Sequence, residues 1–411
     1  MIESATGQRV AVTGLGVVAP CGVGAEEFWD GLLKPTGSAS VRSVPAFDPA
    51  TYGVTTVQAR RVDRFAQFAI AAAAQALVDA GLSEELSAAE PIDGVDPRRV
   101  GVILGTGIGG TPTWETAMHA FRDRGPRAVS PLTVLRAMPN SAPAAVSMRW
   151  NLQGPCETVA TACASGTNAV ATAARLIAAG RADVVLAGGA ESCLNEGNVA
   201  AFTNMRALSP TGTSRPFAAN RDGFCLAEGA GVVVLESAAH AKARGARMYA
   251  EILGTAATAD AHHVTAPAPY GAMAARCMEL ALADAGVGAA EVSYVNAHGT
   301  STVFNDAAEA AAIGTVFAGS RPAVTSIKGV TGHALGAAGG LEAVSVALSY
   351  AYRTLPPTLG TEEPDPALDV DVVLAPRPWE PGFAISNSFA FGGHNVTVVF
   401  GPPDRAGTSP G

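Results

Sequence analysis

Hydrophobic and polar positions along this chain form two kinds of segment. Short, near-continuous apolar runs, typical of strands buried on both faces of a sheet, predict strands at residues 9–18, 100–104, 182–187 and 229–236. Apolar residues at helical spacing predict helices at residues 26–33, 65–80 and 144–150. Because the two kinds of segment alternate, the pattern indicates an α/β fold.

The central stretch of this pattern covers residues 154–180, GPCETVATACASGTNAVATAARLIAAG. Its first part predicts a short buried strand at 157–161, and an Ala-rich helix follows from Ala164 to a closing Gly180. Cys163 therefore lies at a strand-to-helix turn among small residues. Free N–H groups at a helix start lower the pKa of a thiol, so Cys163 is predicted to be an activated nucleophile.

The second part of the chain repeats the first weakly. Residues 68–82 and 273–287 both read as a helix ending in Asp-Ala-Gly and followed by a strand. Residues 224–237 and 389–401 both place small residues and glycine before a Val-rich strand. The repeat predicts two fused, pseudo-symmetric halves, residues 1–250 and 251–411, packed as one body.

Composition and charge narrow the class of protein. Of 411 residues, 48% are hydrophobic and 15% charged, which suits a large core, and the net charge of −9 argues against a nucleic-acid partner. The six cysteines are scattered, without a CxxC pair, so we expect reduced thiols in a cytoplasmic protein. No signal peptide or membrane span is predicted, and residues 1–7 and 402–411 are expected to be frayed.

Three segments of the second half carry reactive side chains. They are NAHGTST at 296–302 with His298, SIKGVTGHALGAAGG at 326–340 with Lys328 and His333, and NSFAFGGHN at 387–395. Each follows a predicted apolar strand, and ligands bind beyond the carboxyl ends of strands in parallel sheets. We therefore expect His298 and His333 to share a site with Cys163, although either histidine alone could be structural.

Two other motifs give weaker signals. GTGIGG at 105–110 fits a dinucleotide-binding pattern, but no acidic residue follows at a strand end at the required distance. His262 and His263 lack further ligands at metal spacing, so a hydrogen-bonded loop is expected there. Neither a nucleotide nor a metal site is predicted from these residues.

Taken together, VATACASGTNAV, NAHGTST, KGVTGHALGAAGG and NSFAFGGHN resemble the active-site motifs of the β-ketoacyl-acyl carrier protein synthases. The elongating type II synthases and type II polyketide ketosynthases are the most similar group, and the similarity extends over nearly the whole chain. The resemblance implies the thiolase fold, a five-layered αβαβα arrangement, in a two-chain assembly. It also implies a partner, acyl carrier protein, whose phosphopantetheine carries the substrates, and no separate cofactor.

The resemblance assigns roles to individual residues. Cys163 would accept the acyl group as a thioester, and His298 and His333 would hold the malonyl thioester carbonyl during decarboxylation. This chemistry needs neutral imidazoles that donate hydrogen bonds, with Lys328 fixing their tautomers near His333 and Glu342. Backbone N–H groups of Cys163 and Phe391 would form an oxyanion hole, and Phe391 would gate the site. Thr300 and Thr302 would bind the phosphopantetheine arm.

Further assignments concern the rim of the site. Ile108 and Phe202 resemble residues of the acyl pocket, although ordinary core packing explains them equally well. An acidic carrier protein needs a basic patch, for which Arg60, Arg61, Arg64, Arg124, Arg127 and Arg206 are candidates. Of these, Arg61, Arg127 and Arg206 match docking positions of related enzymes. No structural metal is predicted, but the resemblance allows a monovalent cation near Asn296, Glu342 and Asn387.

Several alternatives stay open at this point. A thiolase is disfavoured because no cysteine follows Cys277, and a non-catalytic chain-length factor because Cys163 is present. A cysteine hydrolase would not need the second histidine. The Asn-Asp pair at 305–306 resembles polyketide ketosynthases, and Ala390 replaces a usual glycine beside the gate. The sequence leaves open the chain length, the choice between fatty-acid and polyketide pathways, and the choice between a homodimer and a pairing with a chain-length-factor-like partner.

Overall fold

The computed structural model describes residues 8–90, 92 and 94–403. Residues 1–7 and 404–411, in the segments expected to be frayed, lie outside the described residues. The main strands of the first half are β1 (Val10–Ala19), β4 (Val100–Gly105), β5 (Cys156–Val159), β6 (Val184–Glu191) and β8 (Gly229–Ser237). Those of the second half are β9 (Ala250–Ala259), β10 (Val292–Asn296), β11 (Ala323–Thr325), β15 (Phe383–Ala390) and β16 (His394–Gly401).

These strands repeat one topology. The first half has the order β1-β8-β6-β4-β5 and the second the order β9-β16-β15-β10-β11. In both halves the first two pairings are antiparallel and the last two are parallel. The two sets meet where β1 pairs with β9 over Val10–Val12, giving a 12-stranded sheet in the described part of the chain. β2 (Gly22–Val23) and β13 (Asp371–Val372) complete this sheet.

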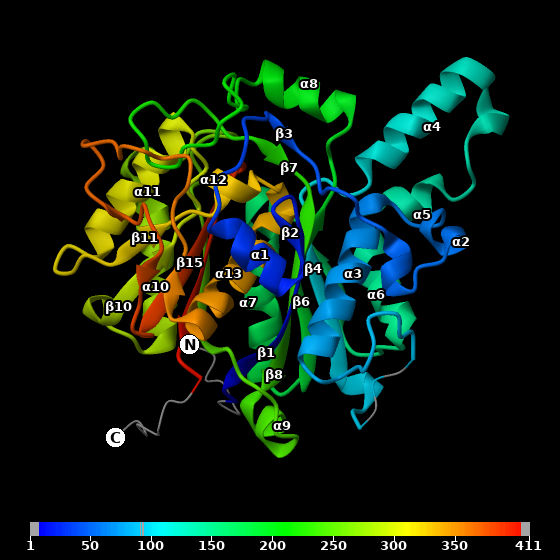
Figure 1. Ribbon diagram of the computed structural model, residues 1–411, viewed down its shortest axis with the longest axis horizontal. Helices are drawn as coiled ribbons and strands as arrows, with labels where there is room; N and C mark the ends of the chain where they lie inside the picture. The colour runs from blue at the N-terminus through cyan, green and yellow to red at the C-terminus, as the bar shows by residue number, and fades with distance from the viewer. Residues whose placement is uncertain (1–7, 91, 93, 404–411) are drawn as a thin grey trace.

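Helices form three layers around the two halves of the sheet (Figure 1). α7 (Ser165–Ala178) and α13 (Ala338–Tyr352) pack against each other in the middle layer. α3 (Arg64–Asp79) and α6 (Ser141–Trp150) cover the outer side of the first half, and α10 (Ala272–Ala285) and α11 (Val303–Val316) that of the second. The result is the predicted αβαβα layering.

The outer helices of the two halves end in the same way. α3 is buried along most of its length, and Gly81 follows it with a φ of +66°. α10 occupies the equivalent place in the second half, and Gly286 follows it with a φ of +63°. Both glycines supply the left-handed conformation that ends a helix. The repeated Asp-Ala-Gly of the sequence therefore marks two helix ends.

The remaining elements are shorter. They are α1 (Ala25–Leu32), α2 (Thr56–Ala59), α4 (Thr111–Arg124), α5 (Thr133–Ala137), α8 (Glu196–Asn204), α9 (Ala238–Ala243), α12 (Lys328–Thr331), β3 (Val41–Arg42), β7 (Leu226–Ala227), β12 (Thr354–Leu355) and β14 (Arg377–Pro378). β3 pairs with β7 in a small separate sheet that approaches the site described below. α4 extends away from the body of the molecule (Figure 1), and the sequence pattern did not predict this helix.

The predicted burial of the strand before Cys163 is wrong. β5 is the last strand in its half of the sheet and pairs with β4 alone. Cys156 and Glu157 are exposed, and Thr158 and Val159 are half-buried. An edge strand has one unpaired side, which a short run of β-forming residues cannot reveal.

All six cysteines are free thiols, as the scattered spacing predicts. Within the described residues, every helix is too short or too polar to cross a bilayer.

Candidate active site

Cys163 lies on a 3₁₀ turn, Ala162–Ala164, between β5 and the start of α7. Ser165 shapes this turn, because its hydroxyl accepts from the N–H of Thr161 at 2.8 Å and donates to the carbonyl of Ala162 at 2.6 Å. The Cys163 side chain is only 6% exposed. The predicted strand-to-helix placement is confirmed.

The predicted lowering of the Cys163 pKa is wrong. Burial raises the pKa of this thiol to about 12, against the opposing effects of the Lys328 charge and of hydrogen bonds from the backbone of Phe391 and of Cys163. Desolvation therefore outweighs the helix start, because it disfavours the charged form of a buried thiol. The Cys163 thiol is therefore protonated at physiological pH, and any reaction in which its sulfur is the nucleophile has to remove that proton.

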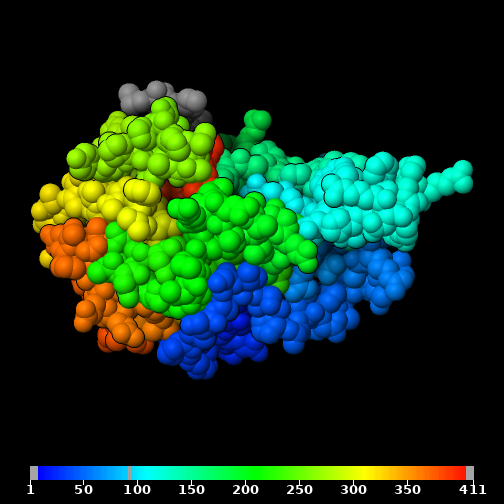
Figure 2. Space-filling view, turned by 90° about the horizontal axis from the view of Figure 1, so that it is seen from above, coloured from blue at the N-terminus to red at the C-terminus, as the bar shows by residue number. Residues whose placement is uncertain are grey.

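A cavity of about 390 Å³ opens over Cys163 and contains residues of both halves. Figure 2 looks onto a hollow where the red end of the chain is visible between green and yellow segments. The site residues expected from the sequence that line this cavity are Cys163, Arg206, His298, Thr300, Thr302, His333, Ala390 and Phe391. Thr300 and Thr302 lie side by side, with 2.9 Å between their hydroxyl oxygens.

His298 follows β10 and is held by polar groups of its own half. Its backbone N–H donates to Glu309 at 2.8 Å, and the N–H of Gly299 donates to the same carboxylate at 2.7 Å. The ammonium of Lys328 lies 3.3 Å from Nδ1 of His298 and 2.5 Å from its carbonyl oxygen. Because an ammonium can only donate, Nδ1 accepts and the ring proton resides on Nε2.

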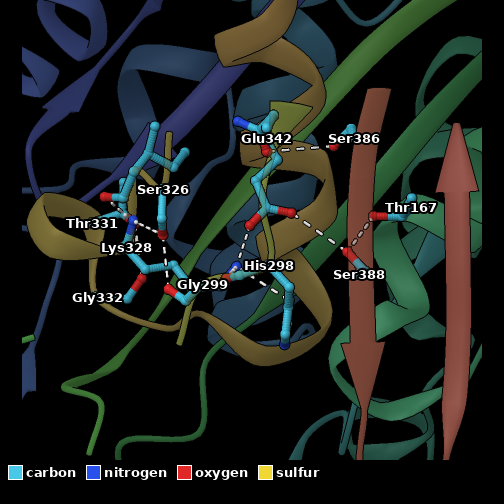
Figure 3. A network of polar contacts seen from close by, with 12 residues as sticks. Thr167, His298, Gly299, Ser326, Lys328, Thr331, Gly332, Glu342, Ser386 and Ser388 are labelled. Atoms are coloured by element: carbon cyan, nitrogen blue, oxygen red, sulfur yellow. Dashed lines mark hydrogen bonds and ion pairs between the residues drawn. The ribbon is translucent and has the colours of Figure 1, made fainter. Parts of the chain in front are cut away.

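Lys328 is buried and ion-paired with Glu342 (Figure 3). Ser388 donates to Glu342 at 3.4 Å and is 2.7 Å from the hydroxyl of Thr167 on α7. The expected contact between Lys328 and Glu342 is therefore confirmed. However, the imidazole that Lys328 contacts is that of His298. Lys328 acts on His333 through its charge, which lowers the pKa of that histidine.

His333 lies beside His298 in the cavity. The two rings are 5.4 Å apart and nearly perpendicular, and Phe224 packs edge-on against His333 at 5.0 Å. Burial lowers the pKa of each histidine well below its usual value, and the Lys328 charge adds to this effect. Both imidazoles are thus neutral at physiological pH, which is the state that an uncharged N–H donor requires.

Phe391 opens a tight turn between β15 and β16, formed with Gly392 and Gly393 at φ values of +84° and +75°. The backbone of Phe391 hydrogen-bonds the Cys163 sulfur, which places an amide beside this atom. Ala390 ends β15 opposite His394 and borders the cavity. Its effect on gating by Phe391 stays a prediction.

Ile108 and Phe202 both pack at the edge of an apolar cluster that contains Cys163, Phe224 and Leu335. This location agrees with an acyl pocket and explains the GTGIGG motif. The N–H groups of Gly107 and Ile108 donate to the buried carboxylate of Glu191 at 2.5 and 3.3 Å. These amides are therefore occupied by a protein carboxylate and do not face a nucleotide phosphate.

The candidate docking arginines differ in their surroundings. Arg61, Arg127 and Arg206 are exposed, and Arg206 borders the cavity. Arg64 forms an ion pair with Glu228 at 2.8 Å, and its guanidinium lies 4.6 Å from the Phe68 ring centre. Arg64 is thus committed to internal contacts and is a poor candidate for docking.

The residues expected near a cation lie on different faces of β15. Asn296 accepts a hydrogen bond from Ser386 at 3.4 Å, and Ser386 shares a face of β15 with Ser388, which contacts Glu342. The amide of Asn387 instead contacts Met278 at 3.3 Å and accepts from Thr397 at 2.8 Å. Asn387 therefore directs its side chain away from Glu342, and the cation stays a prediction.

His263 is part of the hydrogen-bonded loop that the sequence suggested. Its Nδ1 accepts from the N–H groups of Thr265 and Ala266, both at 3.1 Å. The same loop lines the active-site cavity through His263 and Asp260, which sequence reasoning missed.

Sequence reasoning also missed Glu309, Glu191 and Phe389. Glu309 is the one acidic residue in the apolar run AAEAAAI, and an isolated carboxylate on a buried helix face is a usable signal. Glu191 ends an apolar strand in GGAES and offers the same signal. Phe389 lines the cavity, and its ring is 6.2 Å from that of His298.

Known proteins are similar to this chain over nearly its whole length. The family models for the beta-ketoacyl synthase N-terminal and C-terminal domains match residues 34–241 and 249–362. The 3-oxoacyl-acyl-carrier-protein synthase 2 of Staphylococcus aureus (strain COL) is 40% identical over 415 residues, covering 96% of this chain and 98% of the relative. The synthase of the same name from Synechocystis sp. is also 40% identical, with the same shares covered.

Solved structures show the same relationship. The ishigamide ketosynthase/chain length factor matches with a TM-score of 0.87 at 33% identity, covering 96% of this chain and 99% of that one. A type II polyketide ketosynthase in complex with its acyl-carrier protein matches with a TM-score of 0.86 at 31% identity and the same coverage. The five-layered fold of this protein is therefore that of the thiolase-like ketosynthases. With a buried cysteine and two neutral histidines in one cavity, this chain belongs to the β-ketoacyl synthase family.

Proposed function

We propose that this protein elongates an acyl chain by two carbons through decarboxylative Claisen condensation with malonyl-acyl carrier protein. The observation that carries the proposal is the pair of neutral histidines, His298 and His333, facing the same cavity as the buried Cys163. A simple acyl transfer or hydrolysis would need one base. Two adjacent N–H donors are suited to one carbonyl oxygen that gains negative charge.

The reaction divides into two half-reactions. In the first, the Cys163 sulfur attacks the acyl thioester, the phosphopantetheine thiol leaves, and the proton lost by Cys163 ends on that thiol. In the second, malonyl thioester loses carbon dioxide, and the resulting enolate oxygen accepts hydrogen bonds from His298 and His333. The enolate carbon attacks the Cys163 thioester, which releases the enzyme thiolate and the 3-oxoacyl product. The amides of Phe391 and Cys163 stabilise the tetrahedral oxyanion.

Fatty-acid elongation is the first candidate pathway, because the relatives described above are named 3-oxoacyl-acyl-carrier-protein synthase 2. The alternative is the ketosynthase subunit of a type II polyketide synthase. It is supported by the matching ketosynthase structures and by the Asn305-Asp306 pair, of which Asn305 lines the cavity. Chain length and pathway would follow from product analysis.

The proposed partners are acyl carrier protein and a second chain. Exposed Arg61, Arg127 and Arg206 support docking of an acidic carrier protein, and phosphopantetheine would reach Thr300 and Thr302 through the cavity. The unpaired edge of β5 supports pairing with a second copy or with a chain-length-factor-like partner. Exposed apolar side chains in the same half, Trp114, Phe121 and Leu135, support it as well. No separate cofactor is part of the proposal, and a cytoplasmic location stays an expectation from the sequence.

The proposal is tested by incubating the protein with acyl- and malonyl-carrier protein, followed by mass spectrometry of intact protein and products. We expect an acyl adduct on Cys163 and a product two carbons longer. Cys163→Ala should abolish condensation, whereas Cys21→Ala, which changes a half-buried thiol outside the cavity and outside β5, should leave it intact. Full activity of Cys163→Ala would refute the proposal.

Carrier-protein docking is tested separately. Arg127→Glu and Arg206→Glu should raise KM for carrier-protein substrates about tenfold, because they reverse charge at the rim of the interface. Arg276→Glu, an exposed change on α10 in the other half, is the control. An unchanged KM in both docking variants would contradict the assignment.

A further inference from the structure

The segment that carries His333, residues 328–337, contacts the first half of the chain at three places. We call it the His333 segment. In its middle, the N–H of His333 donates to the carbonyl of Cys225 at 2.7 Å, and the N–H of Ala227 donates to the carbonyl of His333 at 3.0 Å. These bonds add His333 to the small sheet as a second partner of β7, on the side of β7 away from its pairing with β3. The backbone of His333 is thus positioned by residues of the other half.

At the start of the segment, the contact is with Arg42 of β3. This side chain is 6% exposed, and its Nη1 donates to the carbonyls of Gly329 at 2.8 Å and Val330 at 2.5 Å. Both carbonyls belong to α12, directly after Lys328. Among the described residues, no carboxylate forms an ion pair with Arg42. A buried guanidinium without a counter-charge is costly, so carbonyl contacts are its main compensation.

At the end of the segment, the contact is with Glu191 of β6. Its carboxylate is fully buried and accepts from the N–H of Gly336 at 3.1 Å, in addition to the N–H groups of Gly107 and Ile108. Gly336 and Gly107 approach so closely that a Cβ on Gly336 would lie 2.2 Å from the Gly107 nitrogen. Within the described residues, Glu191 also lacks an ion-pair partner. One buried carboxylate thus joins the acyl-pocket loop to the His333 segment.

We infer that Arg42 and Glu191 are positioning residues, which place His333 for decarboxylation by fixing the two ends of its segment from the opposite half. Arg42 fixes the end next to Lys328, and Glu191 fixes the end next to the acyl pocket. Their opposite charges match the groups they meet, since the cation binds carbonyl oxygens and the anion binds N–H groups. The inference rests on the proposed function, because it assigns His333 to the decarboxylation half-reaction.

Measuring the two half-reactions separately distinguishes a positioning role from a general loss of stability, because a loss of stability would slow both. Acylation of Cys163 uses its sulfur and the amides of Cys163 and Phe391, which lie outside the His333 segment. Malonyl decarboxylation depends instead on the positions of His298 and His333. Arg42→Met should lower kcat for decarboxylation of malonyl-carrier protein by about 10- to 100-fold, because misplacing a reacting group by about 1 Å has that cost. Acylation of Cys163, followed by intact mass, should change less than about twofold. Arg42→Lys keeps the charge and should recover part of the decarboxylation rate.

Arg99→Met is the matched control. Arg99 forms an ion pair with Asp183 at 2.7 Å in the same half but does not contact the His333 segment. It should leave the ratio of the two rates unchanged. Glu191→Gln provides a second test if Arg42→Met fails to fold. It should lower decarboxylation and also shift the preferred acyl chain length, because Glu191 holds Ile108 as well.

The outcomes distinguish the inference from the proposed function. Wild-type protein that neither accepts an acyl group nor decarboxylates malonyl-carrier protein would refute both. Wild-type protein active in both steps, with Arg42→Met slowing them equally, would overturn the inference alone. An Arg42→Met variant with an unchanged decarboxylation rate would overturn it as well. A selective loss, partly restored in Arg42→Lys, would support it.

Discussion

The two histidines of the cavity, His298 and His333, are held in different ways. The segment of His298, residues 296–302, hydrogen-bonds Glu309 and Lys328, which belong to the same half of the chain. The His333 segment is instead contacted by Arg42, Glu191 and the backbone of β7, all from the first half. The spacing of the two imidazoles therefore depends on how the halves fit together. A duplicated fold has produced a site that neither half could assemble alone.

Lys328 is where the two segments meet, and its removal should have the largest effect. Lys328→Met removes the ammonium beside Nδ1 of His298 and a charge that lowers the pKa of both histidines. We expect malonyl decarboxylation to fall by about 10²- to 10³-fold, comparable to loss of an oxyanion donor. Burial, the larger cause of the lowered histidine pKa, remains in this variant. Protonation of the histidines should therefore reduce the residual activity at a higher pH than in wild type, but still below their ordinary value of about 6.5.

Release of carbon dioxide between pH 5.5 and 8 measures this effect. The double variant Lys328→Met/Glu342→Gln is the control, because it removes the unpaired buried carboxylate that the single change leaves. If His333 supports malonyl decarboxylation without His298, the single variant would keep most of the wild-type rate. That result would contradict the claim that the two segments act together.

The second prediction concerns whether either segment prepares Cys163 as a thiolate. Because burial raises the pKa of Cys163 to about 12, its thiolate fraction should rise about tenfold per pH unit. Alkylation by iodoacetamide should therefore accelerate about 100-fold from pH 7 to pH 9 without a plateau. Peptide mass spectrometry separates Cys163 from the exposed Cys156. A plateau below pH 8 would show that Cys163 is already ionised there, and would support the lowered pKa expected from the helix start.

The smallest predicted effect is on stability, and it tests the internal support of His298. Glu309→Gln places an NH2 group against one of two backbone N–H donors, so the free energy of unfolding should fall by about 1–3 kcal/mol. Glu291→Gln, an exposed change at a helix start, should alter it by less than about 0.5 kcal/mol. Urea unfolding of both variants gives the comparison.

The ionisation of Glu309 also makes the free energy of unfolding depend on pH, and the sign of this dependence follows from its pKa. Burial raises the pKa of Glu309 to about 8, against hydrogen bonds from Gly299 and His298. Between the ordinary pKa of a glutamate and about pH 8, Glu309 therefore keeps its proton in the folded state and loses it in the unfolded chain. This contribution is fully present below the unfolded pKa and is lost as pH rises to about 8. Wild type should lose more stability than Glu309→Gln between pH 5 and pH 8, and equal losses would contradict the raised pKa.

Much of this arrangement could be predicted from residue patterns. The repeated Asp-Ala-Gly helix ends and Val-rich strands reflect two copies of one topology, and glycine-rich strand ends identified Cys163, His298, Lys328 and His333. These features are local, so a single sequence displays them. The exposure of β5 depends on which strands become neighbours, and the pKa of Cys163 depends on the burial that both halves produce. Local pattern contains neither quantity.

Arg42 and Glu191 also could not be assigned a role in the site from local sequence pattern. A lone arginine after Ser-Val looks like an ordinary surface residue until the fold buries it. The place of Glu191 at the end of an apolar strand signals burial, but it does not reveal which groups the carboxylate meets. Their contacts join positions more than a hundred residues apart, such as Glu191 and Gly336. Residues that act through another residue have no motif of their own and are found through geometry.

The pairing of β1 has a consequence for how the chain is made. This ten-residue strand pairs along its length with β8, as where Leu15 lies opposite Val233, 218 residues away, and its first residues also pair with β9. At translation rates of about 5–20 residues per second, β1 leaves the ribosome about 10–40 s before its partners. An apolar strand that lacks both of these neighbouring strands for that time keeps unpaired backbone groups and is prone to aggregation. The earliest part of the fold to be synthesised is therefore among the last to be completed, and the nascent chain depends on protection during that interval.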